Sequence, residues 1–233
     1  MIVKDGWPFI LIALVLTVVL LLGALKWDSL LLIILSSLLA VITLFMAFFF
    51  RNPDRIIPDV PLSILASADG RIVKIESFNH PYVDGPATRI SIFLSVFDVH
   101  VNRVPVSGII DYVKYNPGKF FPAFEDKASD LNEQTEIGLT MPEGQRLVFT
   151  QIAGILARRI VCNLKKGDTV SAGERFGMIR FGSRCDIILP EESTLKVKIG
   201  DRVKGGTTII GYLPAPADNQ HHSDGVTEDN VKL

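Results

Sequence analysis

The chain has 233 residues and a formal net charge of −1, from 24 basic and 25 acidic side chains. This length suits one ordinary domain with accessory segments, and the balanced charge gives no reason to expect bulk attraction to nucleic acid. The two cysteines, Cys162 and Cys185, are too few for a disulfide framework or a cysteine-rich metal site, so we expect two reduced thiols. Hydrophobic residues make up 48% of the chain, and the excess over a soluble protein lies mostly in residues 1–50.

Two long apolar runs open the chain, at about residues 7–25 and 30–50. Each has about the 20 residues that a helix needs to cross the hydrocarbon core of a bilayer. The link between them, Lys26 to Ser29, is short and polar, so the two spans must form a hairpin with both ends on one side. A cleaved signal peptide fits poorly, because the first run is long and the second follows at once. We therefore predict a transmembrane helical hairpin over residues 1–52.

Basic residues predict the orientation of this hairpin. Lys4 lies before the pair and Arg51 and Arg55 lie after it, whereas the link holds Lys26 alone. The positive-inside rule then places both ends, and all that follows, on the cytoplasmic face of the cell (inner) membrane. Pro53 disfavours helix at the residue before it, so the next domain should begin close to the lipid headgroups.

Residues 53–213 read as a mainly β domain with a minor helical part. Short runs of β-branched and aromatic residues alternate with glycine and proline, as is typical of strands joined by turns. The predicted strands include residues 71–75, 88–94, 108–115, 147–152, 185–189, 194–199 and 207–213. Residues 120–132 and 153–159 are the clearest helical segments. Residues 214–233 are polar and contain proline, so we predict a disordered tail, in which His221 and His222 have no further metal ligands nearby.

One internal repeat stands out in this domain. Residues 165–173 recur 33 residues later as residues 198–206, each with Gly-Asp in a turn, a valine two residues on and a second glycine. Repeats of this form build barrels or sandwiches of hairpins like those of biotinyl and lipoyl carrier domains. Those carriers need a lysine at a hairpin tip, and the corresponding Met178-Ile179-Arg180 lacks one. The repeat therefore predicts an architecture and not a carrier function.

Few side chains outside the tail are suited to catalysis. His80 lies in a predicted loop, and His100 follows the predicted strand 88–94. Taken alone, Asp69 reads as an Asp-Gly turn and Ser183 as a loop serine after Gly182. The Gly-x-Ser-x-Gly elbow of serine hydrolases is absent around Ser183. The chain also has no His-Glu-x-x-His motif and too few histidines for a convincing zinc site, so we predict no metal centre.

A set of motifs, in order, resembles the phosphatidylserine decarboxylase family in its short bacterial membrane-anchored form. The motifs are Phe-Phe-Arg-Asn-Pro at 49–53, Ala-Asp-Gly at 68–70, Phe-Asp-Val-His-Val-Asn-Arg at 97–103, Gln-Ile-Ala-Gly at 151–154 with Ala-Arg-Arg-Ile-Val at 157–161, and Arg-Phe-Gly-Ser at 180–183. The resemblance covers residues 48–213, and the Phe-Gly-Ser element is its most specific part.

The resemblance implies a proenzyme that cuts itself between Gly182 and Ser183. In such enzymes the serine hydroxyl attacks the preceding carbonyl, and the serine becomes a pyruvoyl group, which forms a Schiff base with the substrate amine and accepts electrons as CO2 leaves. The reaction converts phosphatidylserine to phosphatidylethanolamine. By the same resemblance His100 is the base and Asp69 the carboxylate that orients it. The two chains made from the precursor stay associated, and a homo-oligomer is expected.

The chain departs from longer relatives at one motif position. Those relatives have a second histidine, the base for self-cleavage, where this chain has Arg103. Two alternatives stay open: His100 serves both maturation and decarboxylation, or the maturation base is another group. Arg103 itself is a candidate for binding the substrate carboxylate or phosphate, against the alternative of a structural ion pair.

Two other functions compete with this interpretation. A related serine-headgroup lipid such as archaetidylserine could be the substrate, because the sequence does not reveal the lipid tail. A non-catalytic, membrane-tethered β-barrel binding module would show no chain cleavage at all. For the enzyme, we expect that deleting residues 1–50 leaves a foldable domain with impaired access to lipid in a bilayer.

Overall fold

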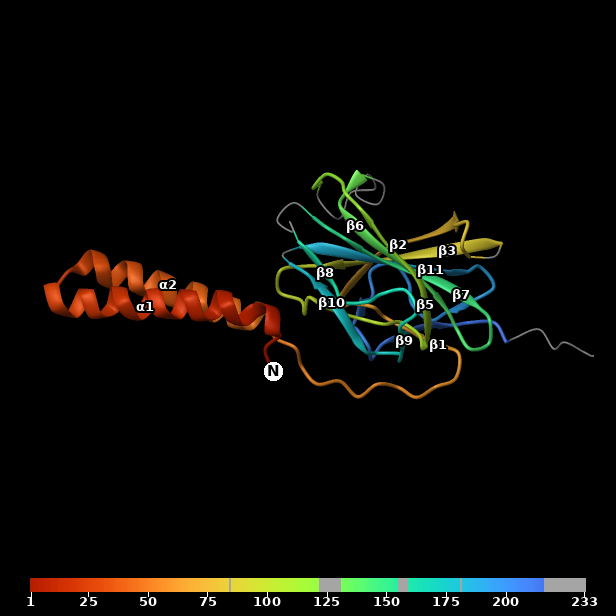
Figure 1. Ribbon diagram of the computed structural model, residues 1–233, viewed down its shortest axis with the longest axis horizontal. Helices are drawn as coiled ribbons and strands as arrows, with labels where there is room; N and C mark the ends of the chain where they lie inside the picture. Colours follow the sequence, from red (N-terminus) through yellow and green to blue (C-terminus); the bar gives the residue numbers. More distant parts are fainter. Residues whose placement is uncertain (84, 122–130, 155–158, 181, 216–233) are drawn as a thin grey trace, which may run out of the picture.

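The computed structural model describes residues 1–83, 85–121, 131–154, 159–180 and 182–215. A short 3-10 turn, η1 (Lys4–Gly6), leads into α1 (Trp7–Trp27) and α2 (Leu30–Phe49). The two helices run antiparallel and project from one side of a β domain (Figure 1). Both are long and apolar enough to cross a membrane, and most of their surface is exposed. The predicted helical hairpin is therefore confirmed.

The rest of the described chain is mainly β, as predicted. The strands are β1 (Ser63–Leu65), β2 (Gly70–Asn79), β3 (Pro86–Leu94), β4 (Val101–Arg103), β5 (Gly108–Asn116), β6 (Gln134–Thr140), β7 (Arg146–Ile152), β8 (Ile160–Cys162), β9 (Thr169–Val170), β10 (Arg175–Ile179), β11 (Ser183–Pro190), β12 (Thr194–Leu195), β13 (Arg202–Val203) and β14 (Ile209–Tyr212). The largest sheet has the order β13-β2-β3-β11-β7-β6-β5-β9, and two smaller ones have the orders β4-β10-β8 and β1-β14-β12.

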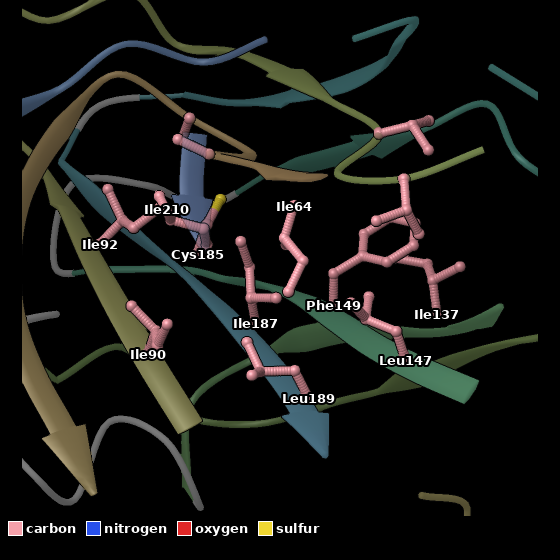
Figure 2. Close-up of a cluster of buried hydrophobic side chains, with 14 of the residues drawn as sticks. Ile64, Ile90, Ile92, Ile137, Leu147, Phe149, Cys185, Ile187, Leu189 and Ile210 are labelled. Carbon is pink, nitrogen blue, oxygen red and sulfur yellow. The ribbon is translucent and has the colours of Figure 1, made fainter. Parts of the chain in front are cut away.

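The core lies against one face of the large sheet, which curls as a half-barrel. Alternate residues of its central strands point into the core, because successive side chains of a strand face opposite sides. On β11 these are Cys185, Ile187 and Leu189, which pack with Ile90 and Ile92 of β3 (Figure 2). All five are essentially inaccessible to solvent. Strand β11 is an interior strand of this sheet and pairs with β3 on one side and β7 on the other.

The two copies of the sequence repeat occupy opposite ends of the large sheet. The first contains β9, which pairs with β5, and the second contains β13, which pairs with β2. In each copy the aspartate carboxylate, of Asp168 or Asp201, accepts a hydrogen bond from the backbone N–H three residues earlier, at 2.8 and 2.9 Å. The glycines before them, Gly167 and Gly200, have φ of +90° and +98°, which favours glycine. The repeat thus builds two equivalent turns.

Several predicted segments differ from the observed ones. The predicted strand 194–199 is regular only at Thr194–Leu195, because Lys198 already belongs to the turn of the second repeat. Strand β6 was not among the predicted strands, although Ile137 and Leu139 alternate with less buried neighbours toward its ends. The helices predicted at 120–132 and 153–159 lie largely outside the described residues, as does the tail after residue 215.

Candidate active site

Gly182 and Ser183 lie at the point where the chain passes from one sheet to another. The connection after β10 leads out of the small sheet β4-β10-β8, and Ser183 is the first residue of β11 in the large sheet. Gly182 has a φ of +62°, a conformation that costs a residue with a Cβ roughly 1–2 kcal/mol. A Cβ on Gly182 would meet no neighbour within 4 Å. The backbone conformation, and not lack of space, therefore favours glycine here.

The Ser183 hydroxyl is buried and has no hydrogen-bond partner in the described part of the chain. Its residue pairs with Leu94, the last residue of β3. A buried hydroxyl without a partner loses its hydrogen bonds to water and gains none in return, which is unfavourable by roughly 1–3 kcal/mol. Such an unsatisfied group in a native structure calls for an explanation, and chemical reactivity is one.

Strand pairing brings His100 to this bend. Strand β3 ends at Leu94, opposite Ser183, and six residues later His100 directly precedes β4, which pairs with β10. Both ends of the β3–β4 connection are therefore tied to the two ends of the β10–β11 connection. The backbone hydrogen bonds of the β4–β10 and β3–β11 pairs therefore bring His100 and Gly182 together, although they are far apart in the sequence.

The contacts of His100 define its tautomer. Nδ1 lies 3.0 Å from the carbonyl oxygen of Asp98, so it carries the proton and donates it. The backbone N–H of Gly182 donates to Nε2 at 3.4 Å. The lone pair of the imidazole thus faces the peptide segment that the sequence motif marks for cleavage.

The environment keeps this imidazole neutral. His100 is completely shielded from solvent, and burial lowers its pKa to about 4, against a smaller opposing effect of the Asp98 carbonyl and carboxylate. The Asp98 carboxylate is itself held by the backbone N–H and the hydroxyl of Ser95, at 2.8 and 2.7 Å. A neutral histidine whose unprotonated Nε2 faces Gly182 is suited to accept a proton there.

Two buried side-chain amides, of Gln151 and Asn102, connect the strands around the site. The sequence patterns predicted no role for them. Gln151 of β7 donates to the side-chain oxygen of Asn102 at 2.8 Å, and Asn102 donates to the sulfur of Cys185 at 3.2 Å. Gln151 also donates to the carbonyl of Val161 at 3.2 Å. These bonds connect β4, β7, β8 and β11 around the bend. A signal was present, because amides within strongly apolar strand motifs must find partners when buried.

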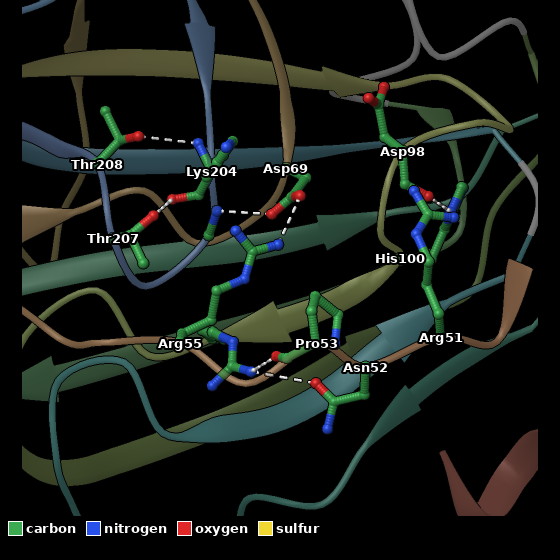
Figure 3. A network of polar contacts seen from close by, with 12 residues as sticks. Arg51, Asn52, Pro53, Arg55, Asp69, Asp98, His100, Lys204, Thr207 and Thr208 are labelled. Carbon is green, nitrogen blue, oxygen red and sulfur yellow. Dashed lines mark hydrogen bonds and ion pairs between the residues drawn. The ribbon is translucent and has the colours of Figure 1, made fainter. Parts of the chain in front are cut away.

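Asp69 belongs to a neighbouring cluster. Its carboxylate forms an ion pair with Arg55 at 2.8 Å and accepts the backbone N–H of Gly205 at 2.8 Å. Figure 3 shows Asp69 facing Arg55, with His100 farther along the network beside Arg51 and Asp98. A triad implies a direct hydrogen bond between Asp69 and His100. The partners of Asp69 in the structure are instead Arg55 and Gly205.

The internal repeat offers a structural reason for an acceptor at position 69. Asp69 accepts the N–H of Gly205 from the second copy, and the hydroxyl of Ser107 accepts the N–H of Ala172 from the first copy at 2.9 Å. Each acceptor directly precedes a glycine that begins a strand, β2 or β5. Asp69 and Ser107 thus occupy equivalent positions relative to the two copies. Asp69 differs in that it also forms the ion pair with Arg55.

Arg103 also contacts the segment that follows α2. Its guanidinium donates to the carbonyl of Gly173 at 2.9 Å, to the side-chain oxygen of Asn52 at 3.1 Å and to the carbonyl of Pro53 at 3.4 Å. Burial lowers its pKa. These contacts favour a structural role, and substrate binding by Arg103 remains a prediction.

The other candidates noted in the sequence lie elsewhere. His80 is 3.5 Å from Glu136 and lines a separate cavity of about 250 Å³ with Arg89 and Asp186. Cys162 and Cys185 are free thiols, as expected. Within the described residues, no group of three or more histidine, cysteine or acidic side chains could hold a metal ion. Among the predicted site residues, the structure brings His100 to the bend formed by Gly182 and Ser183.

The chain is similar to known proteins over most of its length. A family model described as phosphatidylserine decarboxylase matches residues 42–211. Proteins named phosphatidylserine decarboxylase proenzyme from Desulfotalea psychrophila and Geotalea uraniireducens are 42% and 44% identical to the chain, over 90% and 91% of it and 95% and 97% of their own lengths. One from Salinibacter ruber is 48% identical over 78% of the chain and 82% of its own length. On this evidence the chain is a decarboxylase and belongs to the phosphatidylserine decarboxylase family.

Proposed function

We propose that the chain is a proenzyme that cuts itself between Gly182 and Ser183 and then decarboxylates phosphatidylserine to phosphatidylethanolamine and CO2 at a membrane surface. The observation that carries the proposal is the buried, unpartnered hydroxyl of Ser183 on a left-handed glycine bend beside a neutral histidine. The family relationship supplies the substrate class, because the relatives are named for it.

In the proposed maturation, the Ser183 hydroxyl attacks the carbonyl carbon of Gly182 while His100 accepts the hydroxyl proton. The C–N bond between the two residues breaks, and the acyl group moves to the serine oxygen as an ester. Loss of the serine α-proton then expels the Gly182 carboxylate. Water replaces the remaining nitrogen, which leaves as ammonia. His100 would accept the first proton at Nε2 when its hydrogen bond from the Gly182 N–H, 3.4 Å long, is released, and the low pKa keeps Nε2 unprotonated well below neutral pH.

The pyruvoyl group that this maturation would form fits the residues present, because Ser183 is enclosed at the start of a buried strand and no second side chain bonds its oxygen among the described residues. When present, the group acts as an electron sink for decarboxylation. His100 would hold a proton beside it, and the strand pairs of β11 with β3 and β7 would fix its position.

The strand order supports continued association of the two fragments after cleavage. The shorter fragment, residues 183–233, would carry β11, which lies between β3 and β7 of the longer fragment. It would also carry β13 and β14, which pair with β2 and β1. Separating the fragments would expose most of the core, so they should remain one folded unit without a covalent link.

The two helices support a site at the membrane surface. We infer that α1 and α2 span the cell membrane and that the β domain lies on its cytoplasmic face, because basic residues flank the open end of the hairpin. At this end Arg180, two residues before Gly182, stacks its guanidinium 5.0 Å from the ring of Phe9 in α1. Its Nε is buried without a partner among the described residues, and Arg159 lies close enough to lower its pKa further. A lipid phosphodiester would suit this pair of cations.

Mass spectrometry of the intact, natively expressed protein tests the proposal. We expect two fragments, residues 1–182 and 183–233, the shorter one lighter by one ammonia than a peptide with an N-terminal serine and reactive toward hydrazine. Ser183→Ala should remain a single, inactive chain, because it lacks the attacking hydroxyl. The matched control is Ser193→Ala, which removes another buried hydroxyl, outside the site and without a partner among the described residues, and it should cleave normally. Recovery of only the full-length 25.7 kDa chain from the unaltered protein would refute self-processing.

A further inference from the structure

The end of the second membrane helix reaches His100. Phe49 is the last residue of α2 and is fully buried. Its ring lies against the imidazole of His100, with 4.3 Å between ring centroids and an interplanar angle of 39°. A residue of the anchor therefore contacts the histidine that faces the scissile segment. A simple tether would not require this contact.

The contact belongs to a packed cluster that joins the helices to the β domain. Phe49 and Phe50 meet edge to face at 5.1 Å, and the backbone of Phe50 accepts a hydrogen bond from the N–H of Val3 at 3.0 Å. The helical end contributes Val3, Ile10, Phe49 and Phe50 to the cluster. The β domain contributes Val99 from the loop before β4, Val101 from β4 and Met178 from β10. The helical end is thus part of a hydrophobic cluster shared with the β domain, and its member Phe49 contacts His100.

Three contacts together fix the imidazole. The Asp98 carbonyl holds one ring nitrogen, the Gly182 N–H holds the other, and Phe49 covers a face of the ring. The charged groups that act on His100 are the Asp98 carboxylate in its own loop and Arg51 just after α2, with opposite effects on its pKa. The largest influence is burial, to which the Phe49 ring contributes directly.

We propose that Phe49, at the end of α2, is a positioning residue for His100, so that the membrane hairpin completes the site of self-cleavage in addition to anchoring the enzyme. The inference rests on the proposed role of His100 in maturation. It separates two functions of the hairpin, because self-cleavage needs no lipid substrate. A hairpin that only delivers the domain to lipid would affect turnover of phosphatidylserine and leave self-cleavage unchanged.

The test follows self-cleavage of the full-length chain, made by cell-free synthesis in detergent micelles without phosphatidylserine. We expect Phe49→Ala to cleave at least about tenfold more slowly than the unaltered chain, since a misplaced proton acceptor costs this much or more. Leu44→Ala is the matched control, because it removes an apolar side chain of α2 that is 72% exposed, and it should cleave at the normal rate. If Phe49→Ala does not fold, Phe49→Leu keeps an apolar cover without the ring and should show a smaller slowing.

A second readout does not depend on cleavage. Histidine resonances of the uncut Ser183→Ala chain report the titration of His100, with an expected midpoint of about 4. Adding Phe49→Ala should move this midpoint upward toward 6.5, the value of an exposed histidine, whereas Leu44→Ala should not move it. Equal cleavage rates and an unchanged His100 midpoint in a folded Phe49→Ala or Phe49→Leu chain would overturn the inference. Normal cleavage of His100→Ala would instead overturn the proposed role of His100, and the inference with it.

Discussion

At the scale of single residues, the environment of a side chain separates the groups that we propose to react from those that hold the fold. His100 and Ser183 are both buried, yet His100 is fixed by three contacts and the Ser183 hydroxyl by none among the described residues. Two arginines differ in the same way. Arg103 is satisfied by backbone and amide oxygens, whereas Arg180 has a buried Nε without a partner in the described chain.

This difference predicts separate effects of substituting the two arginines. In the matured enzyme, Arg180→Gln should raise the KM for phosphatidylserine in mixed micelles by about tenfold, the size of one charge-assisted hydrogen bond. Arg103→Lys should leave kcat/KM within about twofold and lower the thermal unfolding midpoint, because lysine cannot replace the planar set of donors. Steady-state kinetics and thermal melts of both variants check this. A raised KM for Arg103→Lys with normal KM for Arg180→Gln would assign headgroup binding to Arg103 instead.

At the scale of elements, the segment after α2 is clamped to the β domain. Its contacts are Arg51 with the carbonyl of Phe97 at 2.6 Å, Arg103 with Asn52 and Pro53, and Arg55 with Asp69. The clamp fixes where α2 ends, and so where Phe49 meets His100. In the proposed self-cleavage, Asp69 would therefore act through the position of the helix end, and its partners among the described residues are Arg55 and Gly205.

A double-mutant cycle tests this indirect role. We expect Asp69→Asn and Arg55→Gln each to slow self-cleavage by about three- to tenfold, and the double variant to be no slower than the slower single variant, because both remove one ion pair. The measurement is the cleavage time course of the full-length chain. Ser107→Ala is the control, since Ser107 occupies the equivalent position of the other repeat without contacting the clamp.

The opposite pattern would assign Asp69 a more direct function. If Asp69→Asn abolished cleavage while Arg55→Gln cleaved almost normally, the carboxylate would act on the maturation chemistry itself, as the family resemblance implies. The amide of asparagine can still accept the Gly205 N–H, so a loss of this size would not follow from the turn alone.

At the scale of the whole molecule, burial of His100 connects stability to pH. The folded pKa of about 4 lies below the value near 6.5 of an exposed histidine. Between these values the unfolded chain binds a proton that the folded chain does not, so this group makes the folded state less stable as pH falls from 6.5 toward 4. Above pH 6.5 the residue is neutral in both states and contributes no such dependence.

The prediction is a loss of about 2 kcal/mol in unfolding free energy between pH 7 and pH 5 from this residue alone. Chemical unfolding of the uncut Ser183→Ala chain in detergent, with and without His100→Gln, measures it as the difference between the two pH dependences. Identical pH dependences would mean that His100 has the same pKa in the folded and unfolded chains, in conflict with its burial.

The sequence by itself determined the features that depend on local pattern and composition. Apolar length predicted the helical hairpin, alternation predicted most strands of the β domain, and the repeated Gly-Asp turns predicted two equivalent structures. Motif order identified Ser183 and His100 as candidates. These inferences succeed because periodicity, turn chemistry and residue type act over a few neighbouring positions.

Only the tertiary structure decided which distant residues meet. The pairing of β4 with β10 and of β11 with β3 brings His100 to Gly182, across 82 positions of sequence. The same packing pairs Asp69 with Arg55 and Arg103 with Asn52 in the segment after α2, and it brings Phe49 to the histidine. Such contacts arise from strand register and the close packing of side chains, which no local pattern encodes. The helical hairpin was predicted as an anchor, and its contact with the imidazole could be found only in the folded chain.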